Sequence, residues 1–281
     1  MPVLVLYLSA CSEPVTLPTE GEFSALSYNV HGLPPTITGD DTAGRMALIA
    51  PLLPGFDVIG LQEDFDDDNH ATLEASSEHP TRIRFAELLE DERFYGPGLA
   101  VFAQPDAVHT HHEHYEDCSG VLEGASDCLA SKGFQVIRLQ LGPEEGHTLD
   151  LYNTHMEAGG GEGDIAARAG HLDQLLVAMS GVSAGRAVLF LGDTNLHGGD
   201  PAELAEVERL LEGAGLTELC VAVDCPEPER IDRILYRSSD AMEITGLDWW
   251  VAEGFEDADS VPLSDHDPIA GRIGWASTSE D

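Results

Sequence analysis

The stretch Ala187-Val188-Leu189-Phe190-Leu191-Gly192-Asp193-Thr194-Asn195 joins an apolar run to polar side chains. A short continuous apolar run that ends at a glycine predicts a strand buried on both faces. We expect Gly192 to end the strand, because glycine allows a sharp turn, and Asp193 and Asn195 to share one side by the period of two. An acid and an amide placed there can bind a hard cation or phosphate oxygens. An Asx-turn that closes the strand is the alternative interpretation.

The rest of the chain alternates buried strands with helices. The patterns predict strands at 23–30, 57–62, 98–104, 108–115, 132–141, 148–154, 231–236 and 244–251, and helices at 41–53, within 81–90, at 165–179 and at 201–212. We expect 108–115 to be the hairpin partner of 98–104, and 64–69 to be a solvated loop. With no break in this pattern, the sequence predicts a single α/β domain over residues 23–275.

Other predicted strands also end in polar residues. These residues are Asn29, Glu63, His155 and the pair Asp265-His266. Loops at strand ends converge in sheet proteins, and binding sites form there. We therefore expect these side chains to meet Asp193 and Asn195 in one site.

The charge of the chain limits its partners. It carries 52 acidic and 13 basic residues, for a formal net charge of −39, and its only lysine is Lys132. A chain this acidic repels a polyanion, so duplex nucleic acid is a disfavoured partner.

Four of the five cysteines form close pairs. Cys118 with Cys128 and Cys220 with Cys225 fit two short-loop disulfides formed in an oxidising compartment, and a zinc site is the alternative. The fifth, Cys11, follows Leu8-Ser9-Ala10 in a segment like a bacterial lipoprotein signal, which predicts lipidation and export to the cell envelope or beyond. The alternative is an ordinary N-terminus with an odd cysteine. Residues 12–22 are predicted to form a linker, and residues 276–281 an acidic tail.

Five motifs appear in the order typical of one superfamily. They are Tyr28-Asn29-Val30-His31-Gly32, Leu61-Gln62-Glu63, Asn153-Thr154-His155, Gly192-Asp193-Thr194-Asn195 and Ser264-Asp265-His266-Asp267-Pro268. In this the chain resembles the endonuclease/exonuclease/phosphatase superfamily, which has the DNase I-like fold. The resemblance implies a four-layer α/β sandwich in which two mixed sheets are flanked by helices. It also implies Mg²⁺-dependent hydrolysis of a phosphate ester, with Mn²⁺ or Ca²⁺ as alternative ions.

The resemblance and the residue chemistry suggest roles for these side chains. Glu63, Asn29 and Asp265 would hold the metal, and His266 would be the general base, since imidazole titrates near neutrality. By the same interpretation, Asp232 would be the carboxylate that orients His266. His155 and Asn195 would donate to the phosphoryl oxygens, and Asp193 would orient the water. Structural roles are the alternatives: a helix-cap acid for Glu63, a core histidine for His155, and a surface ion pair with Arg230 or Arg233 for Asp232.

Three segments are similar to those of bacterial sphingomyelinases. They are Leu61-Gln62-Glu63-Asp64-Phe65-Asp66, Asp127-Cys128-Leu129-Ala130-Ser131-Lys132-Gly133 and His155-Met156-Glu157-Ala158. This similarity favours a phospholipid substrate, with Lys132 and His31 as substrate-binding residues and contact with a membrane surface; a solvent-facing Lys132 is the alternative. Two other functions remain open: an extracellular nuclease that uses the same residues, and an inactive binding lipoprotein.

Overall fold

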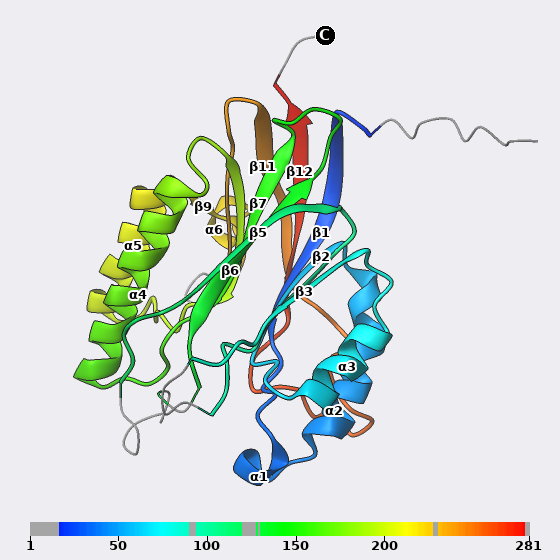
Figure 1. The fold of residues 1–281 in the computed structure, drawn as a ribbon, viewed down its shortest axis with the longest axis vertical. Helices are drawn as coiled ribbons and strands as arrows, with labels where there is room; N and C mark the ends of the chain where they lie inside the picture. The colour runs from blue at the N-terminus through cyan, green and yellow to red at the C-terminus, as the bar shows by residue number, and fades with distance from the viewer. Residues whose placement is uncertain (1–16, 90–93, 120–127, 129, 227–229, 279–281) are drawn as a thin grey trace, which may run out of the picture.

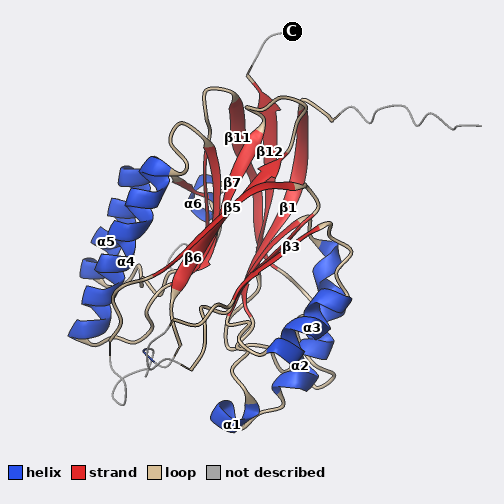
Figure 2. Ribbon diagram, viewed as in Figure 1, coloured by secondary structure: helices blue, strands red, loops and turns tan. Residues whose placement is uncertain are grey.

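Two six-stranded β-sheets pack face to face, and helices cover the outer side of each sheet (Figures 1 and 2). The structure is a computed structural model, and it describes residues 17–89, 94–119, 128, 130–226 and 230–278. Helices α2 and α3 lie against one sheet, and α4 and α5 lie against the other. This arrangement is the four-layer α/β sandwich predicted from the sequence.

The described elements follow one another in a simple order. They are β1 (Glu20–Asn29), α1 (Pro35–Thr38), α2 (Thr42–Ile49), the 3-10 helix η1 (Ala50–Gly55), β2 (Val58–Gln62), α3 (Asp67–Ala75), β3 (Thr81–Phe85), β4 (Leu99–Ala103), β5 (Ala107–His114), β6 (Gly133–Gln140), β7 (Thr148–His155), α4 (Glu162–Gly181), β8 (Ala187–Asp193), α5 (Pro201–Ala214), β9 (Thr217–Glu218), α6 (Leu219–Ala222), β10 (Asp232–Arg237), β11 (Met242–Val251) and β12 (Ile269–Ser277). None of the described helices is both long and apolar enough to cross a membrane.

Both sheets are mixed. The strand order is β11-β12-β1-β2-β4-β3 in the first sheet and β5-β6-β7-β8-β10-β9 in the second. The pairs β1–β2 and β7–β8 are parallel, so β1 and β2 end at the same edge of their sheet, as do β7 and β8 of theirs. These four ends carry most of the polar residues that the sequence singles out.

Apolar side chains fill all three spaces between the four layers. On β8, Leu189 and Leu191 pack between the two sheets, whereas Val188 and Phe190 pack against the helices on the other side. The strand is therefore buried on both faces, as its continuous apolar run predicts.

A polar contact ties the two sheets together inside this apolar interface. The Asn153 side chain on β7 donates through Nδ2 to the carbonyl oxygens of Leu61 on β2 (2.9 Å) and Ala100 on β4 (3.0 Å). Its Oδ1 accepts a hydrogen bond of 2.7 Å from Nε2 of Gln62. Asn153 and Gln62 are fully buried, and Glu63 follows Gln62 directly, so this contact sets the position of one sheet's site residues relative to the other's.

Three predictions of local structure were wrong. The region within 81–90 begins with a strand rather than a helix, because residues 81–85 pair with β4 as β3. Residues 64–69 are not a solvated loop, since Asp64 is buried and α3 begins at Asp67, capped by Asp66. The strand near 108–115 exists, but it pairs with β6 in the second sheet rather than with β4.

Gly192 does not end its strand as the sequence suggested. It lies within β8, where a Cβ would come within 2.6 Å of Cγ2 of Thr154 and 2.7 Å of its carbonyl oxygen. Glycine is therefore required by the close approach of β7. Since β8 ends at Asp193, the period of two does not extend to Asn195.

The structure confirms the predicted cysteine pairs and extends the domain beyond its predicted ends. The structure contains both predicted disulfides, Cys118–Cys128 and Cys220–Cys225. β1 begins at Glu20, so the predicted linker ends before that residue, and β12 continues to Ser277. The predicted lipidation at Cys11 lies outside the described residues.

We expect an Asn153→Ala variant to lower the free energy of unfolding by about 2–3 kcal/mol, because it removes the donor to two buried carbonyl oxygens and the shortest acceptor contact of the Gln62 amide. Chemical denaturation followed by circular dichroism measures this change. Gln104→Ala removes an exposed amide just after β4 and should change stability by less than about 0.5 kcal/mol. Equal effects of the two substitutions would contradict the role assigned to Asn153.

Candidate active site

The site forms where the strands of both sheets end. β1 contributes Asn29, β2 leads into Glu63, β7 ends at His155 and β8 ends at Asp193. The segment before β12 adds Asp265 and His266, and β10 begins with Asp232.

Three residues of the site have a backbone conformation that residues other than glycine rarely adopt. The φ angles of His31, Glu63 and Asn195 are 49°, 59° and 50°. Such a conformation costs of order 1–3 kcal/mol per residue and persists only where the surroundings enforce it. Gly32 is part of these surroundings, because a Cβ at that position would overlap the carbonyl oxygen of Glu63.

Asn29 connects the two sheets at the centre of the site. Its Nδ2 lies 3.1 Å from Oε1 of Glu63 and 3.1 Å from Oδ2 of Asp193, and its Oδ1 accepts a 3.0 Å hydrogen bond from the backbone N–H of His31. Burial raises the pKa of Glu63. Burial, with the negative charge of Asp232, raises the pKa of Asp193 to about 6.

Lys132 faces the site rather than solvent. It is 3% exposed, which excludes the solvent-facing alternative, and its Nζ lies 3.0 Å from Nε2 of His155. Burial and the neighbouring Lys132 charge hold the pKa of His155 well below its usual range, so its imidazole is neutral. Nε2 of His155 is also 3.4 Å from Oδ2 of Asp193.

His266 is held by two carboxylates. Its Nδ1 lies 2.9 Å from Oδ2 of Asp232, and its Nε2 lies 3.6 Å from Oδ2 of Asp193. Burial alone would lower the pKa of His266, but the hydrogen bond and charge of Asp232, with the charges of Asp193 and Asp265, raise it to about 10. Asp232 thus pairs with His266, whereas Arg230 and Arg233 pair with other acids.

His31 lies between two carboxylates predicted to bind metal. Its Nδ1 is 3.2 Å from Oδ1 of Asp265 and 3.9 Å from Oε2 of Glu63. The hydrogen bond to Asp265 raises the pKa of His31, and the same bond lowers the pKa of Asp265 to about 2.

The chemistry of this pocket fits a bound cation. Oε2 of Glu63 and Oδ1 of Asp232 are buried and have no hydrogen-bond partner among the described residues. Such oxygens are costly unless a positive charge compensates them. Ligand atoms of Asp193, Asp232 and His266 also lie within 4.8 Å of one another, which makes this triad a second candidate metal group.

Asp193 uses its two oxygens for different purposes. Oδ1 accepts a 3.0 Å hydrogen bond from the backbone N–H of Asn195, which is an Asx-turn that closes the strand. Oδ2 faces Asn29, His155 and His266. Asp193 therefore closes the turn with one oxygen and faces the other site residues with the second.

Arg45 is a supporting residue that the sequence analysis missed. From α2 it donates to the carbonyl oxygens of Val30 (3.1 Å), His31 (2.8 Å) and Leu263 (2.7 Å), and so holds the loop after β1 against the segment before Asp265. No local pattern distinguishes Arg45 from a surface arginine. Ser264 has a related role, since its Oγ donates to the Asn29 carbonyl oxygen (2.6 Å), and its position in the Ser-Asp-His motif was a usable signal.

Comparison with known sequences identifies the family. The sequence model of the Endonuclease/Exonuclease/phosphatase family matches residues 26–266, so the chain belongs to this family. A protein named sphingomyelinase from Mycobacterium tuberculosis is 27% identical over 275 residues, covering 88% of this chain and 52% of that protein. The chain spans about half the length of the curated relatives it matches.

Comparison with solved structures shows the same fold. Sphingomyelinase C from Streptomyces griseocarneus superposes with a TM-score of 0.65 at 18% identity, covering 91% of this chain and 99% of that one. A mutant beta toxin from Staphylococcus aureus with bound magnesium ions gives 0.64 at 17% identity, covering 89% and 99%. D. rerio TDP2 complexed with a single-strand DNA product gives 0.64 at 18% identity, covering 90% and 98%.

We expect an Asp232→Asn substitution to lower the pKa of His266 from about 10 toward 6.5. In the folded wild type the ion pair raises the pKa above that of the unfolded chain. Its contribution to stability is therefore complete below about pH 6.5 and is lost as the pH rises toward 10. An NMR titration of the His266 imidazole signals in EDTA measures the pKa in both proteins. A wild-type His266 that titrates near 6.5 would contradict the geometry.

Proposed function

We propose that this chain is a Mg²⁺-dependent phosphodiesterase of the sphingomyelinase type, which cleaves a phospholipid on the glycerol or ceramide side of its phosphate. The observation that carries the proposal is the His266–Asp232 pair beside the carboxylates of the partly buried Glu63 and the buried Asp193. Hydrolysis of a phosphodiester needs a base for the attacking water and positive charge for the phosphoryl oxygens, and this pocket combines the two requirements.

In the proposed reaction His266 removes a proton from the attacking water. Asp232 accepts from Nδ1 of the ring, which leaves Nε2 for the water. Asp193 lies next to this nitrogen and would orient the water. The base must be neutral before it acts, and neutralising the nearby carboxylates would lower its pKa toward the working range.

Other residues would receive the phosphoryl group. Lys132 supplies a buried positive charge, and a neutral His155 and the Asn195 amide supply hydrogen-bond donors. Glu63, Asn29 and Asp265 would hold Mg²⁺, with Asn29 using its Oδ1. A bound Mg²⁺ supplies Lewis-acid stabilisation of the charge that builds on the phosphoryl oxygens. His31 contacts the carboxylates of Glu63 and Asp265, so we propose that it positions these metal ligands and does not bind the substrate.

The charge distribution supports a lipid over a nucleic acid. The chain has 13 basic residues against 52 acids. Most of the described arginines are engaged within the protein, on carboxylates, carbonyl oxygens or a hydroxyl: Arg45, Arg82, Arg84, Arg138, Arg168, Arg186, Arg209, Arg230, Arg233 and Arg237. A surface that binds a phosphate backbone needs arginines or lysines that point outward. A zwitterionic phospholipid imposes no such requirement.

Export is part of the same proposal. Disulfides persist in oxidising compartments, and this chain contains two. A lipid anchor on Cys11 would place the enzyme near membrane phospholipids. Contact with the membrane does not follow from the two adjacent tryptophans, because Trp249 packs in the core between the sheets and Trp250 packs, half-buried, against the core on the other side.

We expect the purified protein to release phosphocholine from sphingomyelin in detergent micelles with Mg²⁺, and to lose this activity in EDTA. His266→Ala should lower kcat by about 10²–10⁴-fold, the usual contribution of a general base. His147→Ala is the matched control, because His147 is a buried histidine that contacts Ser277 instead of the site. Cleavage of single-strand or duplex DNA without cleavage of lipid would favour the nuclease, and no cleavage of either by the folded protein would favour the binding protein.

Metal binding is tested separately from activity. We expect Glu63→Gln to weaken Mg²⁺ binding by at least about tenfold in calorimetry, because it removes a carboxylate with a buried oxygen that has no hydrogen-bond partner among the described residues. Glu22→Gln makes the same chemical change on β1 at a distance from the site and should bind as the wild type does. If Glu63→Gln keeps full affinity and Asp193→Asn loses it, the metal belongs to the Asp193–Asp232–His266 triad instead.

A further inference from the structure

Two of the residues proposed to face the phosphoryl group lie where two different loops begin. His155 ends β7 and Asn195 follows β8, and each loop leads into its own helix, α4 or α5. The two loops contact each other directly. The N–H of Met156 donates to the carbonyl oxygen of Asp193 (3.0 Å), and Nδ2 of Asn195 donates to the carbonyl oxygen of Met156 (3.3 Å). The direction of the Asn195 amide therefore depends on where the β7–α4 loop lies.

Arg168 on α4 fixes the first of these loops. Its side chain is 1% exposed, and Nη1 donates to the carbonyl oxygens of Glu157 (2.9 Å) and Gly159 (2.8 Å). Both carbonyls belong to the loop that follows His155. A guanidinium has donors in a fixed planar fork, so it can fix two loop carbonyls and still have donors available for a carboxylate.

Glu203 on α5 connects the same arginine to the second loop. Its carboxylate pairs with Nη2 of Arg168 through Oε1, and its Oε2 accepts a 2.9 Å hydrogen bond from the N–H of His197. His197 lies two residues beyond Asn195, and Glu203 is 3% exposed. One buried ion pair between the neighbouring helices α4 and α5 thus links the loop after His155 to the loop after Asn195; Figure 1 shows the two helices side by side.

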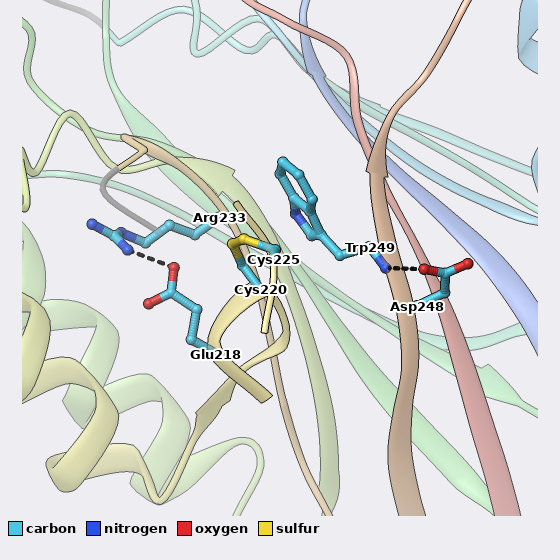
Figure 3. The surroundings of a disulfide bond; sticks show 6 residues. All are labelled: Glu218, Cys220, Cys225, Arg233, Asp248 and Trp249. Atoms are coloured by element: carbon cyan, nitrogen blue, oxygen red, sulfur yellow. Dashed lines mark hydrogen bonds and ion pairs between the residues drawn. A yellow bond between two sulfur atoms is a disulfide. The ribbon is translucent and has the colours of Figure 1, made fainter. Parts of the chain in front are cut away.

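A second buried arginine also holds the Asn195 loop. Arg233 on β10 donates through Nη2 to the carbonyl oxygen of Leu196 (3.1 Å) and pairs through Nη1 with Glu218 (2.6 Å). Figure 3 shows this pair beside the Cys220–Cys225 disulfide. The backbone of the two residues that follow Asn195 is therefore held by side chains, as the unfavourable φ of 50° at Asn195 requires.

We infer that the Arg168–Glu203 pair is a positioning device that aims the Asn195 amide and the His155 imidazole at the phosphoryl group. The inference rests on the proposed phosphodiesterase function. Neither residue touches the reacting atoms in this assignment. Their effect passes through the Glu157, Gly159 and His197 backbone, so the pair acts on catalysis only by fixing the geometry of the two loops.

The test compares a substitution in this pair with the same substitution in a distant pair. Arg168→Met removes the positioning arginine, and Arg138→Met removes the arginine that pairs with Asp150 (2.6 and 2.9 Å) near the beginning of β7. Asp150 precedes His155 by five residues, about 16 Å along the strand. Arg168→Lys is the third variant, because it restores the charge without the planar fork.

We expect Arg168→Met and Arg138→Met both to lower the melting temperature, and Arg168→Met alone to lower kcat on sphingomyelin, by roughly 10²-fold with little change in KM. Arg168→Lys should recover melting temperature more than kcat. Wild-type kcat in folded Arg168→Met, or an equal loss in Arg138→Met, would overturn the inference.

An NMR measurement separates this inference from the proposed function. The side-chain amide signals of Asn195 should shift in Arg168→Met and stay in place in Arg138→Met, whatever the substrate. If the wild type cleaves no phosphodiester, the proposed function has failed, and these signals still report whether the pair positions Asn195. Unmoved Asn195 signals in Arg168→Met would overturn the positioning role.

Discussion

The buried amide contact between Asn153 and Gln62 determines how the two sheets fit together. Apolar packing between sheets is non-directional, so it tolerates small sliding movements. The hydrogen bonds of Asn153 to Gln62 and to the Leu61 and Ala100 carbonyl oxygens are directional and fix the register. Glu63 follows Gln62, and His155 lies two residues beyond Asn153. The distance between the two halves of the site, which lie on different sheets, is thus set by this one contact.

The site at the strand ends, where the two sheets meet, concentrates negative charge and backbone strain. Glu63, Asp193 and Asp232 are brought together in a poorly solvated pocket, where burial raises the pKa of Glu63 and Asp193. Such a pocket is unfavourable for folding unless positive charges compensate the carboxylates, and the protein itself supplies Lys132 and His266. The unusual φ angles at His31, Glu63 and Asn195 add a further cost. A fold accepts such costs at functional sites, where the surrounding structure over-determines the conformation.

The sequence predicted the buried strands and which polar side chains lie together at their ends, because both features leave local signals. Continuous apolar runs marked β2, β4 and β8, and a polar residue at each strand end marked the site. Pairing and irregular segments left weaker signals. Residues 81–85 contain two arginines, and their strand pairing with β4 overrides that polar composition. Asp64 looked solvated within an acidic run, yet it is buried beside His70 at 2.5 Å. Arg45, Arg168 and Glu203 act through backbone groups of loops outside their own helices, and no spacing rule identifies such contacts.

The residues shared by the family do not determine which phosphate ester is hydrolysed. Substrate choice depends on groups outside the reaction centre. Members of one fold can hydrolyse different phosphate esters with the same acid, base and metal ligands. A nuclease must bind a phosphate backbone on both sides of the scissile bond, and that binding requires outward-facing positive charge. Here most described arginines fix loops or pair with acids, and the single lysine is buried in the site itself. Most of these positive charges are therefore engaged within the fold, which supports the proposed substrate with one phosphate and no net charge.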